Sequence, residues 1–388
     1  MFSRRLPTDV TVNALSERLA SLRAAGTRYV DLTESNPTRA GFDYPANLLA
    51  PLANDQGLTY EPHPLGMPGA REAVARECDR RGAAVDASQV VLSASSSESY
   101  AWLFKLLCNP GDQVLVPRPS YPLFEHLTRL EGVEAAAYDL EYDGRWTIDF
   151  DTLERAITPH CRAVLVVSPN NPTGSWVSRS ERNRLERVCR ERQLALIADE
   201  VFVDYPLDAC ADRITDLASD ADVLTFTLGG LSKSAALPQL KLGWIIVGGP
   251  VAARERALEL LELIADTYLS VSSPVQIAAA DLLTRGAAVR AQIQERVRAN
   301  LESLKAEAAR HPACQLLTTE GGWNAVVRVP ALRTEERLVL GLLEDERILV
   351  HPGYFFDFAH EAFVILSLLP SPGVFQTAAA RVLRYTTV

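Results

Sequence analysis

The chain has 388 residues, too many for one simple core, and its length suggests about two domains. A hydrophobic content of 47% and a charged content of 23% are ordinary for a soluble globular protein, and the formal net charge of -10 argues against nucleic-acid binding. The six cysteines are scattered without a CxxC pair, so we expect reduced thiols in a cytoplasmic protein and no metal site. The sequence contains no apolar signal core and no stretch of about 18 apolar residues, so it predicts neither a leader nor a membrane span.

The N-terminal part of the chain is only partly regular. An amphipathic helix is predicted over 11–26, and a short strand follows at 29–33. The segment 60–69 is dense in proline and glycine, so we expect it to be irregular. It leads into a predicted helix over 70–81.

From position 89 onward, short apolar runs alternate with amphipathic helices. The predicted strands cover 89–92, 113–116, 134–138, 163–167, 194–198 and 223–227. The predicted helices between them cover 97–108, 121–130, 151–157 and 180–192. This alternation indicates α/β architecture, with a mostly parallel sheet covered by helices on both faces. A further strand at 245–247 could run antiparallel to the others.

After Gly249 the pattern changes to α+β. Helices dominate from 251 to 311 and include a long charged helix over 288–310. The remaining predicted elements are strands at 324–329 and 363–369 and helices at 335–344 and 375–385. We therefore predict a large domain at 46–285 and a smaller α+β domain formed by 1–45 and 286–388.

Small and polar residues follow five of the predicted strands, directly where each strand ends. These segments are SASSSES after Leu92, PRPSYP after Val116, SPNNPTG after Val167, DEVF after Ala198 and GGLSK after Leu228. In an open α/β sheet, ligands bind beyond the carboxyl ends of the parallel strands, which share one edge. We therefore expect these segments to meet in one cleft.

Each segment also has an ordinary structural interpretation. The serines at 95–97 can be simple helix N-caps, although small hydroxyl residues at a helix N-terminus also bind anions. Asn171 lies in a good turn sequence, and Tyr121 can be a core aromatic residue. Asp199 ends an apolar strand, where a carboxylate is costly unless a cation pairs with it. Lys233, taken alone, is most simply a solvated loop lysine.

Together and in this order, the segments resemble the fold-type I pyridoxal-phosphate enzymes, and within them the class I/II aminotransferase family. The matching stretches are SASSSES, PSYP, SPNNPTG, DEVF, LSK and PQLKLG, with YEPHPLGMPGAR ahead of them. The resemblance covers residues 29–370 and implies an aspartate-aminotransferase-like fold, pyridoxal 5'-phosphate as cofactor and a homodimer with shared active sites. The activity it implies is transfer of an amino group from an amino acid or amine to a keto acid or aldehyde.

The resemblance also implies a role for each site residue. Lys233 would form the Schiff base with the cofactor and then move the substrate proton. Asp199 would face the pyridine nitrogen, Tyr121 would stack on the ring, and Asn171 would donate to the phenolic oxygen. The phosphate would be bound by the remaining residues, which are Ser95, Ser96, Ser97, Lys241 and, from the neighbouring subunit, Tyr60.

Three positions depart from the family pattern. Phe202 stands where the family has a tyrosine that reaches the phenolic oxygen, so Asn171 could be the only donor there unless Tyr205 replaces it. Lys241 stands in place of an arginine and neutralises phosphate as a point charge without a bidentate fork. Ile365 stands where the family has the arginine that binds the substrate α-carboxylate.

The missing arginine leaves the binding of the substrate carboxylate open. Arg39 is the best alternative cation, with Ser35 and Asn171 as further substrate contacts. Either a cation other than that arginine binds the carboxylate, or the usual α-amino acid is not the substrate. The amino donor, the acceptor and the pathway cannot be read from the sequence.

Three functions are compatible with these residues. An aminotransferase rests on the whole set of motifs. A pyridoxal-phosphate-dependent C–S β-lyase, decarboxylase or racemase of the same fold is the alternative, because a changed carboxylate contact could change which bond at Cα breaks. A non-enzymatic protein that kept the fold is disfavoured, because both Lys233 and Asp199 are present.

Overall fold

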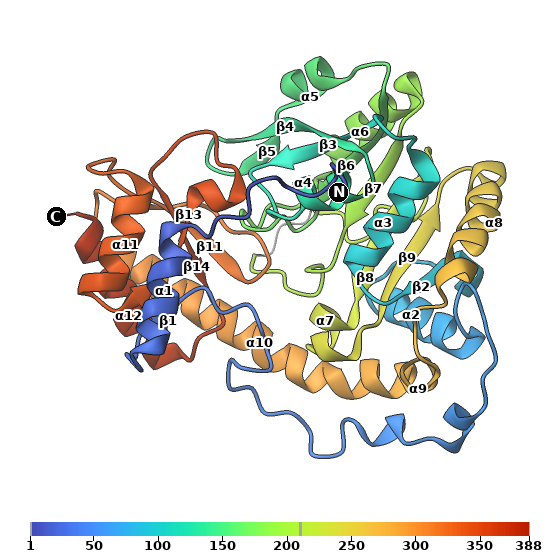
Figure 1. The fold of residues 1–388 in the computed structure, drawn as a ribbon, viewed down its shortest axis with the longest axis horizontal. Helices are drawn as coiled ribbons and strands as arrows, with labels where there is room; N and C mark the ends of the chain where they lie inside the picture. Colours follow the sequence, from blue (N-terminus) through green and yellow to red (C-terminus); the bar gives the residue numbers. More distant parts are fainter. Residues whose placement is uncertain (1, 209–211, 388) are drawn as a thin grey trace.

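The structure, a computed structural model, describes residues 2–208 and 212–387 (Figure 1). A large sheet with its helices lies beside a smaller α+β unit, and one long helix, α10 (Ala279–Ala308), runs along both. None of the helices in the described ranges is long and apolar enough to cross a membrane. Five cysteines in these ranges are free thiols, and Cys210 lies outside the described residues.

Within the described residues the large sheet has eight strands. In spatial order they are β2 (Val90–Ser93), β9 (Gly243–Gly248), β8 (Thr225–Gly230), β7 (Ala195–Asp199), β6 (Cys161–Val167), β3 (Gln113–Arg118), β4 (Glu134–Tyr142) and β5 (Trp146–Ile148). The five strands from β8 to β4 are parallel. β9 is antiparallel to both of its neighbours, which confirms the antiparallel strand expected near 245–247 and leaves β2 pointing with the parallel set. The sequence pattern missed β5, a three-residue strand that forms a hairpin with β4.

Alternation along the strands sends side chains to two apolar layers. In β3, Val114 and Val116 pack with the helices α3 (Ser96–Leu107), α4 (Phe124–Leu130) and α8 (Val251–Tyr268). Leu115, between them, faces α5 (Phe150–Ala156) and α6 (Arg179–Arg192) on the other face. Helices α2 (Pro68–Arg80) and α9 (Ser273–Ile277) and the start of α10 cover the β2–β9 end. The predicted sheet with helices on both faces is therefore confirmed.

The smaller unit contains two further sheets within the described residues. One is antiparallel, with the order β10 (Gln315–Leu316), β11 (Asn324–Arg328), β14 (Phe363–Ser367) and β13 (His351–Pro352). The other pairs β1 (Val30–Asp31) with β12 (Ile348–Leu349) in parallel. The helices α1 (Ala14–Ala24), α11 (Glu335–Asp345), α12 (Pro372–Thr386) and the end of α10 enclose its core. Thus the N-terminal segment and the C-terminal part of the chain share one apolar core.

The long helix α10 begins at Ala279, nine residues before the predicted start at 288, so that predicted boundary is wrong. Gly286 lies inside the helix, where glycine is unfavourable by propensity. A Cβ at Gly286 would lie 2.5 Å from the Cβ of Ala235. The glycine therefore lets α10 approach the segment around the short helix α7 (Leu231–Ser234), which carries Lys233. The helix crosses the predicted boundary at 285/286 without a break, and that division stays a prediction.

The proline- and glycine-rich part near 60 is irregular as expected. It follows two single-turn 3₁₀ helices, Ala50–Leu52 and Asp55–Leu58, in a long excursion along the lower edge of the molecule in Figure 1. Three further 3₁₀ turns lie at Ala87–Gln89, Pro238–Leu240 and Gly353–Phe356. The helix α4 starts at Phe124, three residues later than the predicted start at 121. Tyr121 therefore lies in the turn that precedes the helix.

Candidate active site

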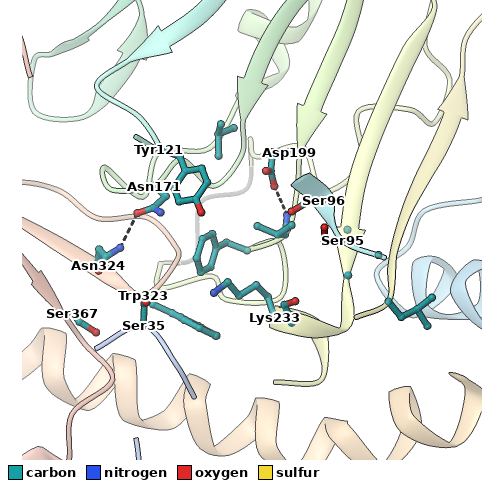
Figure 2. A pocket seen from close by; sticks show the side chains of 18 residues that line it. Ser35, Ser95, Ser96, Tyr121, Asn171, Asp199, Lys233, Trp323, Asn324 and Ser367 are labelled. Carbon is teal, nitrogen blue, oxygen red and sulfur yellow. Dashed lines mark hydrogen bonds between the residues drawn. The ribbon is translucent and has the colours of Figure 1, made fainter. Parts of the chain in front are cut away.

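A cavity opens at the carboxyl edge of the large sheet, where it meets the smaller unit (Figure 2). The predicted site residues that line it are Ser35, Ser95, Ser96, Tyr121, Asn171, Asp199 and Lys233. Four strand ends, those of β2, β6, β7 and β8, supply five of these residues or the loop that carries them. The expected convergence on one edge is what the structure has, because these strands point the same way.

Lys233 lies directly after β8, in α7, and is half-buried. Its Nζ is 4.4 Å from the ring centroid of Trp323 and 5.2 Å from that of Phe202. Loss of hydration lowers the pKa of Lys233 to about 8, against the opposing effect of the Asp199 charge. A lysine in this state loses its proton near neutral pH, which a nucleophile or a general base requires.

Three side chains hold the backbone around Lys233. The Tyr205 hydroxyl donates to the carbonyl of Lys233 at 2.6 Å, and the Arg290 guanidinium donates to the carbonyl of Ser234 at 2.8 Å. The Tyr44 hydroxyl donates to the carbonyl of Ala236 at 2.8 Å. Tyr205 is fully buried and does not line the cavity, so it does not replace the hydroxyl that is absent at position 202.

Asp199 ends β7 and is only 7% exposed. Its Oδ1 accepts from the Val201 amide at 3.0 Å, and its Oδ2 accepts from the Tyr100 hydroxyl at 2.8 Å. Burial raises the pKa of Asp199 in spite of these two hydrogen bonds and of the Lys233 charge. No ion pair to Asp199 occurs among the described residues. A cationic group of a ligand would therefore be favoured next to this carboxylate.

The turn between β2 and α3 presents the N-terminus of a helix to the cavity. Ser95 is the N-cap of α3, and its hydroxyl accepts from the Glu98 amide at 3.2 Å. Ser95 and Ser96 line the cavity, so the positive end of a twelve-residue helix is directed to it. Gly243, at the start of β9, packs against this turn so closely that a Cβ there would lie 2.9 Å from the Ser95 carbonyl carbon.

Asn171 and Tyr121 lie together on the opposite side of the cavity from Lys233 (Figure 2). The side-chain amide of Asn324 donates to Oδ1 of Asn171 at 2.8 Å. This hydrogen bond leaves the Asn171 Nδ2 as the donor that can face a ligand. Tyr121 is 37% exposed, which suits an aromatic face that a flat ligand would cover.

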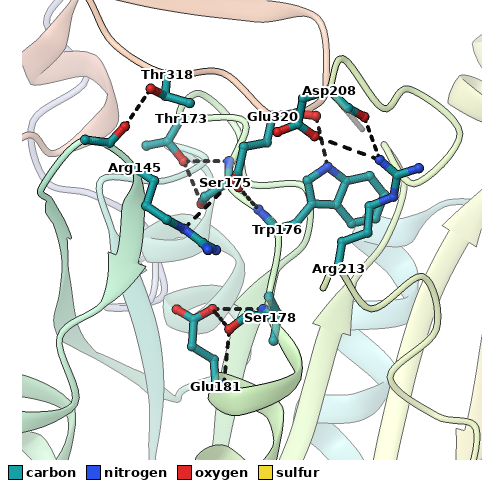
Figure 3. A network of polar contacts seen from close by, with 12 residues as sticks. Arg145, Thr173, Ser175, Trp176, Ser178, Glu181, Asp208, Arg213, Thr318 and Glu320 are labelled. Carbon is teal, nitrogen blue, oxygen red and sulfur yellow. Dashed lines mark hydrogen bonds and ion pairs between the residues drawn. The ribbon is translucent and has the colours of Figure 1, made fainter. Parts of the chain in front are cut away.

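A polar network fixes the loop after Asn171 to the segment that leads into β11 (Figure 3). The Trp176 amide donates to the Glu320 carboxylate at 3.0 Å, and its indole nitrogen donates to the Glu320 carbonyl at 3.2 Å. The Thr318 hydroxyl donates to the Gly144 carbonyl at 2.6 Å. These contacts join the β4–β5 hairpin and the Asn171 loop to the chain segment that brings Trp323 to the cavity.

Four predicted site residues do not line the cavity in this chain: Ser97, Lys241, Arg39 and Tyr60. Lys241 is exposed with left-handed backbone geometry, φ 54°, two residues before Gly243. Arg39 is exposed beyond the turn that follows Ser35. Tyr60 is 72% exposed in the irregular segment. Their roles stay predictions.

The position where an arginine was expected is apolar throughout. Ile365 is fully buried and packs with Trp146, Val326 and Phe356. Lys233 is the only lysine, arginine or histidine among the described residues that line the cavity. A substrate carboxylate would therefore meet hydroxyl and amide groups unless another cation moves toward it.

The sequence pattern did not identify four residues at the site. Trp323, Asn324 and Ser367 reach the cavity from the smaller unit, and no rule about strand ends in the large sheet could have found them. Tyr100, behind Asp199, follows Ser96 by four residues and so lies on the same face of α3. The four-residue spacing from Ser96 could have predicted that Tyr100 faces the site.

Comparisons with known proteins point to one family of enzymes. The sequence profile described as aminotransferase class I and II matches residues 31–379. Glutamate-pyruvate aminotransferase AlaA of Haemophilus influenzae is 26% identical over 383 residues, covering 94% of this chain and 92% of that protein. Alanine aminotransferase of Mycobacterium tuberculosis is 28% identical over 366 residues, covering 91% of this chain and 84% of that protein.

Solved structures support the fold. Alanine aminotransferase from Pyrococcus furiosus superposes over 100% of both chains with a TM-score of 0.90 at 22% identity. A single mutant of Thermus thermophilus aspartate aminotransferase covers 98% of this chain and 99% of its own, with a TM-score of 0.83 at 25% identity. The predicted aspartate-aminotransferase-like fold and the predicted kind of enzyme are confirmed. This chain belongs to the aminotransferase class I and II family.

Proposed function

We propose that the cavity binds pyridoxal 5'-phosphate and that the protein moves an amino group from an amino acid or amine to a keto acid or aldehyde. One observation carries the proposal: Lys233, with a pKa lowered to about 8, shares a cavity with the buried carboxylate of Asp199. A nucleophilic amine and an unpaired buried acid in one cleft indicate a functional site.

The residues present fit this cofactor. Asp199 lacks a cationic partner in the described chain, and a protonated pyridine nitrogen is such a cation. Ser95 and Ser96, at the N-terminus of α3, offer hydroxyl and amide donors to a phosphate. When bound, the cofactor supplies an aldehyde that condenses with amines and a ring that accepts the electrons left by the Cα proton.

The side chains of the cavity would hold the cofactor, move the substrate proton and exclude water. Lys233 would hold the cofactor through its aldehyde, and its Nζ would carry the substrate proton. Asp199 would keep a proton on the ring nitrogen, and the Asn171 Nδ2 would donate to the phenolic oxygen, since Asn324 holds the Asn171 Oδ1. The rings of Trp323 and Phe202 exclude water around the lysine.

The outlying residues are proposed to complete the phosphate site in a homodimer. Tyr60 is 72% exposed and is therefore available to the site of a second subunit. Lys241 immediately precedes two residues that line the cavity, Leu242 and Gly243, and would neutralise phosphate as a point charge. Ser97 would contribute its amide in the first turn of α3. Mixing Lys233→Ala and Tyr60→Phe subunits tests the shared site, because activity should return only in hybrid dimers.

Binding of the substrate carboxylate is assigned to Arg39, with Ser35 and Asn171 as further contacts. The support for Arg39 is that Ser35, four residues earlier, lines the cavity. Amine donors remain possible substrates, because Lys233 is the only cation among the described lining residues. The C–S lyase and decarboxylase alternative is not favoured, since the relatives are named as aminotransferases.

Two broader predictions belong to this proposal. A large domain at 46–285 and a small domain at 1–45 and 286–388 are supported by the apolar core that α1 shares with α11 and α12. Hydrogen exchange, which shows whether each of the two parts opens as one cooperative unit, would test this division. A cytoplasmic location is the second, and fractionation of the native cells would test it.

The central experiment locates the cofactor on the chain. We expect purified protein to bind pyridoxal phosphate, and borohydride reduction followed by peptide mass spectrometry to place the adduct on Lys233. Lys305→Ala, which removes an exposed lysine paired with Glu302, should leave the adduct unchanged, whereas Lys233→Ala should abolish it. An absorbance screen with amino acids and the matching decarboxylated amines then tests the half-reaction. Failure of every donor to convert the bound cofactor to its amine form would count against an aminotransferase.

A further inference from the structure

Tyr100 is a buried tyrosine directly behind the cavity. It lies in α3, is 1% exposed, and donates its hydroxyl hydrogen to Oδ2 of Asp199 at 2.8 Å. The two residues are 99 positions apart in sequence. A buried hydroxyl group needs a hydrogen-bond partner. The partner of the Tyr100 hydroxyl is the Asp199 carboxylate and not a carbonyl of its own helix.

The ring of Tyr100 is fixed by other aromatic rings. It stacks on Phe104 with centroids 6.0 Å apart and meets Phe124 edge-on at 5.4 Å. Phe124 also meets Tyr121 edge-on at 6.0 Å. One phenylalanine therefore supports both Tyr100 and Tyr121, the aromatic residue exposed to the cavity.

We infer that Tyr100 is a positioning residue that keeps Asp199 ionised and oriented toward the cavity. A hydrogen bond donated to a carboxylate favours its charged form, whereas burial favours the neutral form. The inference rests on the proposed function, in which Asp199 must be ionised to hold a proton on the ring nitrogen of the cofactor.

Tyr100 is the side chain that donates a hydrogen bond to the Asp199 carboxylate, whereas the other charged and titratable groups around Asp199 act on it through space. Tyr121 and Glu200 interact with Asp199 through space, and the Glu200 carboxylate instead accepts from the Leu217 amide at 2.8 Å. The Lys233 charge also favours ionised Asp199, but that charge is changed when the lysine reacts. Tyr100 and the Val201 amide then remain as the donors to this carboxylate in the described chain.

The test is the Tyr100→Phe variant, which removes the hydroxyl and keeps the ring packing. Without the hydrogen bond Asp199 is more basic, so the proton that it shares with the ring nitrogen moves toward the carboxylate. We expect the nitrogen-15 shift of ring-labelled pyridoxal phosphate on the variant to move toward the unprotonated form. The half-reaction should slow by about tenfold or more, the size of one hydrogen bond to a charged group.

Tyr138→Phe is a matched control. Tyr138 is also 1% exposed and donates one hydrogen bond of 2.8 Å, but to the Leu165 carbonyl in the apolar layer on the other face of the sheet. Both variants should lose similar stability, whereas only the Tyr100 variant should change the nitrogen-15 shift. In an Asp199→Asn background, Tyr100→Phe should have no further effect on that shift.

The outcomes separate this inference from the proposed function. A wild-type protein that forms no adduct at Lys233 contradicts the proposed function itself. A wild type that forms the adduct, with Tyr100→Phe matching Tyr138→Phe in nitrogen-15 shift and rate, overturns the role of Tyr100 alone. If Tyr100→Phe fails to fold while Tyr138→Phe folds, Tyr100→Leu, which also lacks a donor, is used, and an unchanged shift in that variant also overturns the inference.

Discussion

Replacing Lys233 with methionine should stabilise the protein in the absence of cofactor. The ammonium group of Lys233 is dehydrated between the rings of Trp323 and Phe202, and its pKa is lowered from 10.5 to about 8. Methionine keeps the length of the apolar stem and removes the charge. The residue that the proposed reaction requires is therefore expected to weaken the folded state.

The size of the effect follows from the two pKa values. Below pH 8 the lysine is protonated in both the folded and the unfolded chain, and a depression from 10.5 to about 8 destabilises the folded state by about 3 kcal/mol. Between pH 8 and pH 10.5 the folded chain releases the proton first, so the penalty shrinks to below about 1 kcal/mol at pH 10. Attraction of the ammonium to the Trp323 ring offsets about 0.5–2 kcal/mol of the penalty. The cost of dehydration is thus larger than this attraction. Lys233→Met should therefore raise the free energy of unfolding at pH 7 by about 1–3 kcal/mol.

The assay is urea unfolding of cofactor-free wild type and Lys233→Met at pH 7, 9 and 10. We expect the variant to be more stable at pH 7 and the difference to fade as the pH rises. Lys305→Met, at an exposed lysine, should change the unfolding free energy by less than about 0.5 kcal/mol at every pH. A variant less stable than the wild type at pH 7, or a gain that does not depend on pH, would refute the reasoning.

Three further changes test the cavity from other sides. Gly243→Ala should weaken cofactor binding and lower stability by about 1–3 kcal/mol, because its Cβ would press on the Ser95 backbone, whereas Gly373→Ala, in open space within α12, should be neutral or slightly stabilising in thermal melts. Asn324→Ala removes the 2.8 Å hydrogen bond to Asn171 and should cost about 1 kcal/mol in urea unfolding and slow the half-reaction, a result that unchanged kinetics would contradict. Arg39→Ala should raise KM for amino acids by about tenfold or more while leaving amines unaffected; equal effects on both donors would exclude a carboxylate contact.

Much of the candidate site could be predicted because it follows a topological rule. Lys233, Asp199 and Asn171 stand at or just after the ends of strands that run in the same direction, and such ends share one edge of a sheet. Ser95 and Ser96 followed from the same rule together with the N-cap preference of serine. The convergence of these residues on one edge needed only the order and type of the local elements, which apolar periodicity reveals, whereas their roles came from the family resemblance.

Other features depended on segments that are distant in sequence. Asn324 meets Asn171 across 153 positions, and Tyr100 meets Asp199 across 99. The place of α10 against Ala235 depends on Gly286, which local propensity counts against a helix. Propensity and periodicity describe a residue's own element, so they cannot state which distant side chain will lie against it.

The sequence by itself therefore determined the fold class, which follows from the pattern of a parallel sheet, while the resemblance to the aminotransferase family singled out the lysine and the aspartate on which the proposed chemistry depends. Only the tertiary structure decided their surroundings: the burial that lowers the pKa of Lys233, a buried tyrosine that donates a hydrogen bond to Asp199, and a cavity with Lys233 as its only cation among the described lining residues. The physical reason is that hydration, charge and hydrogen bonding at a site are set by every segment that packs there, and packing joins residues that the sequence keeps far apart.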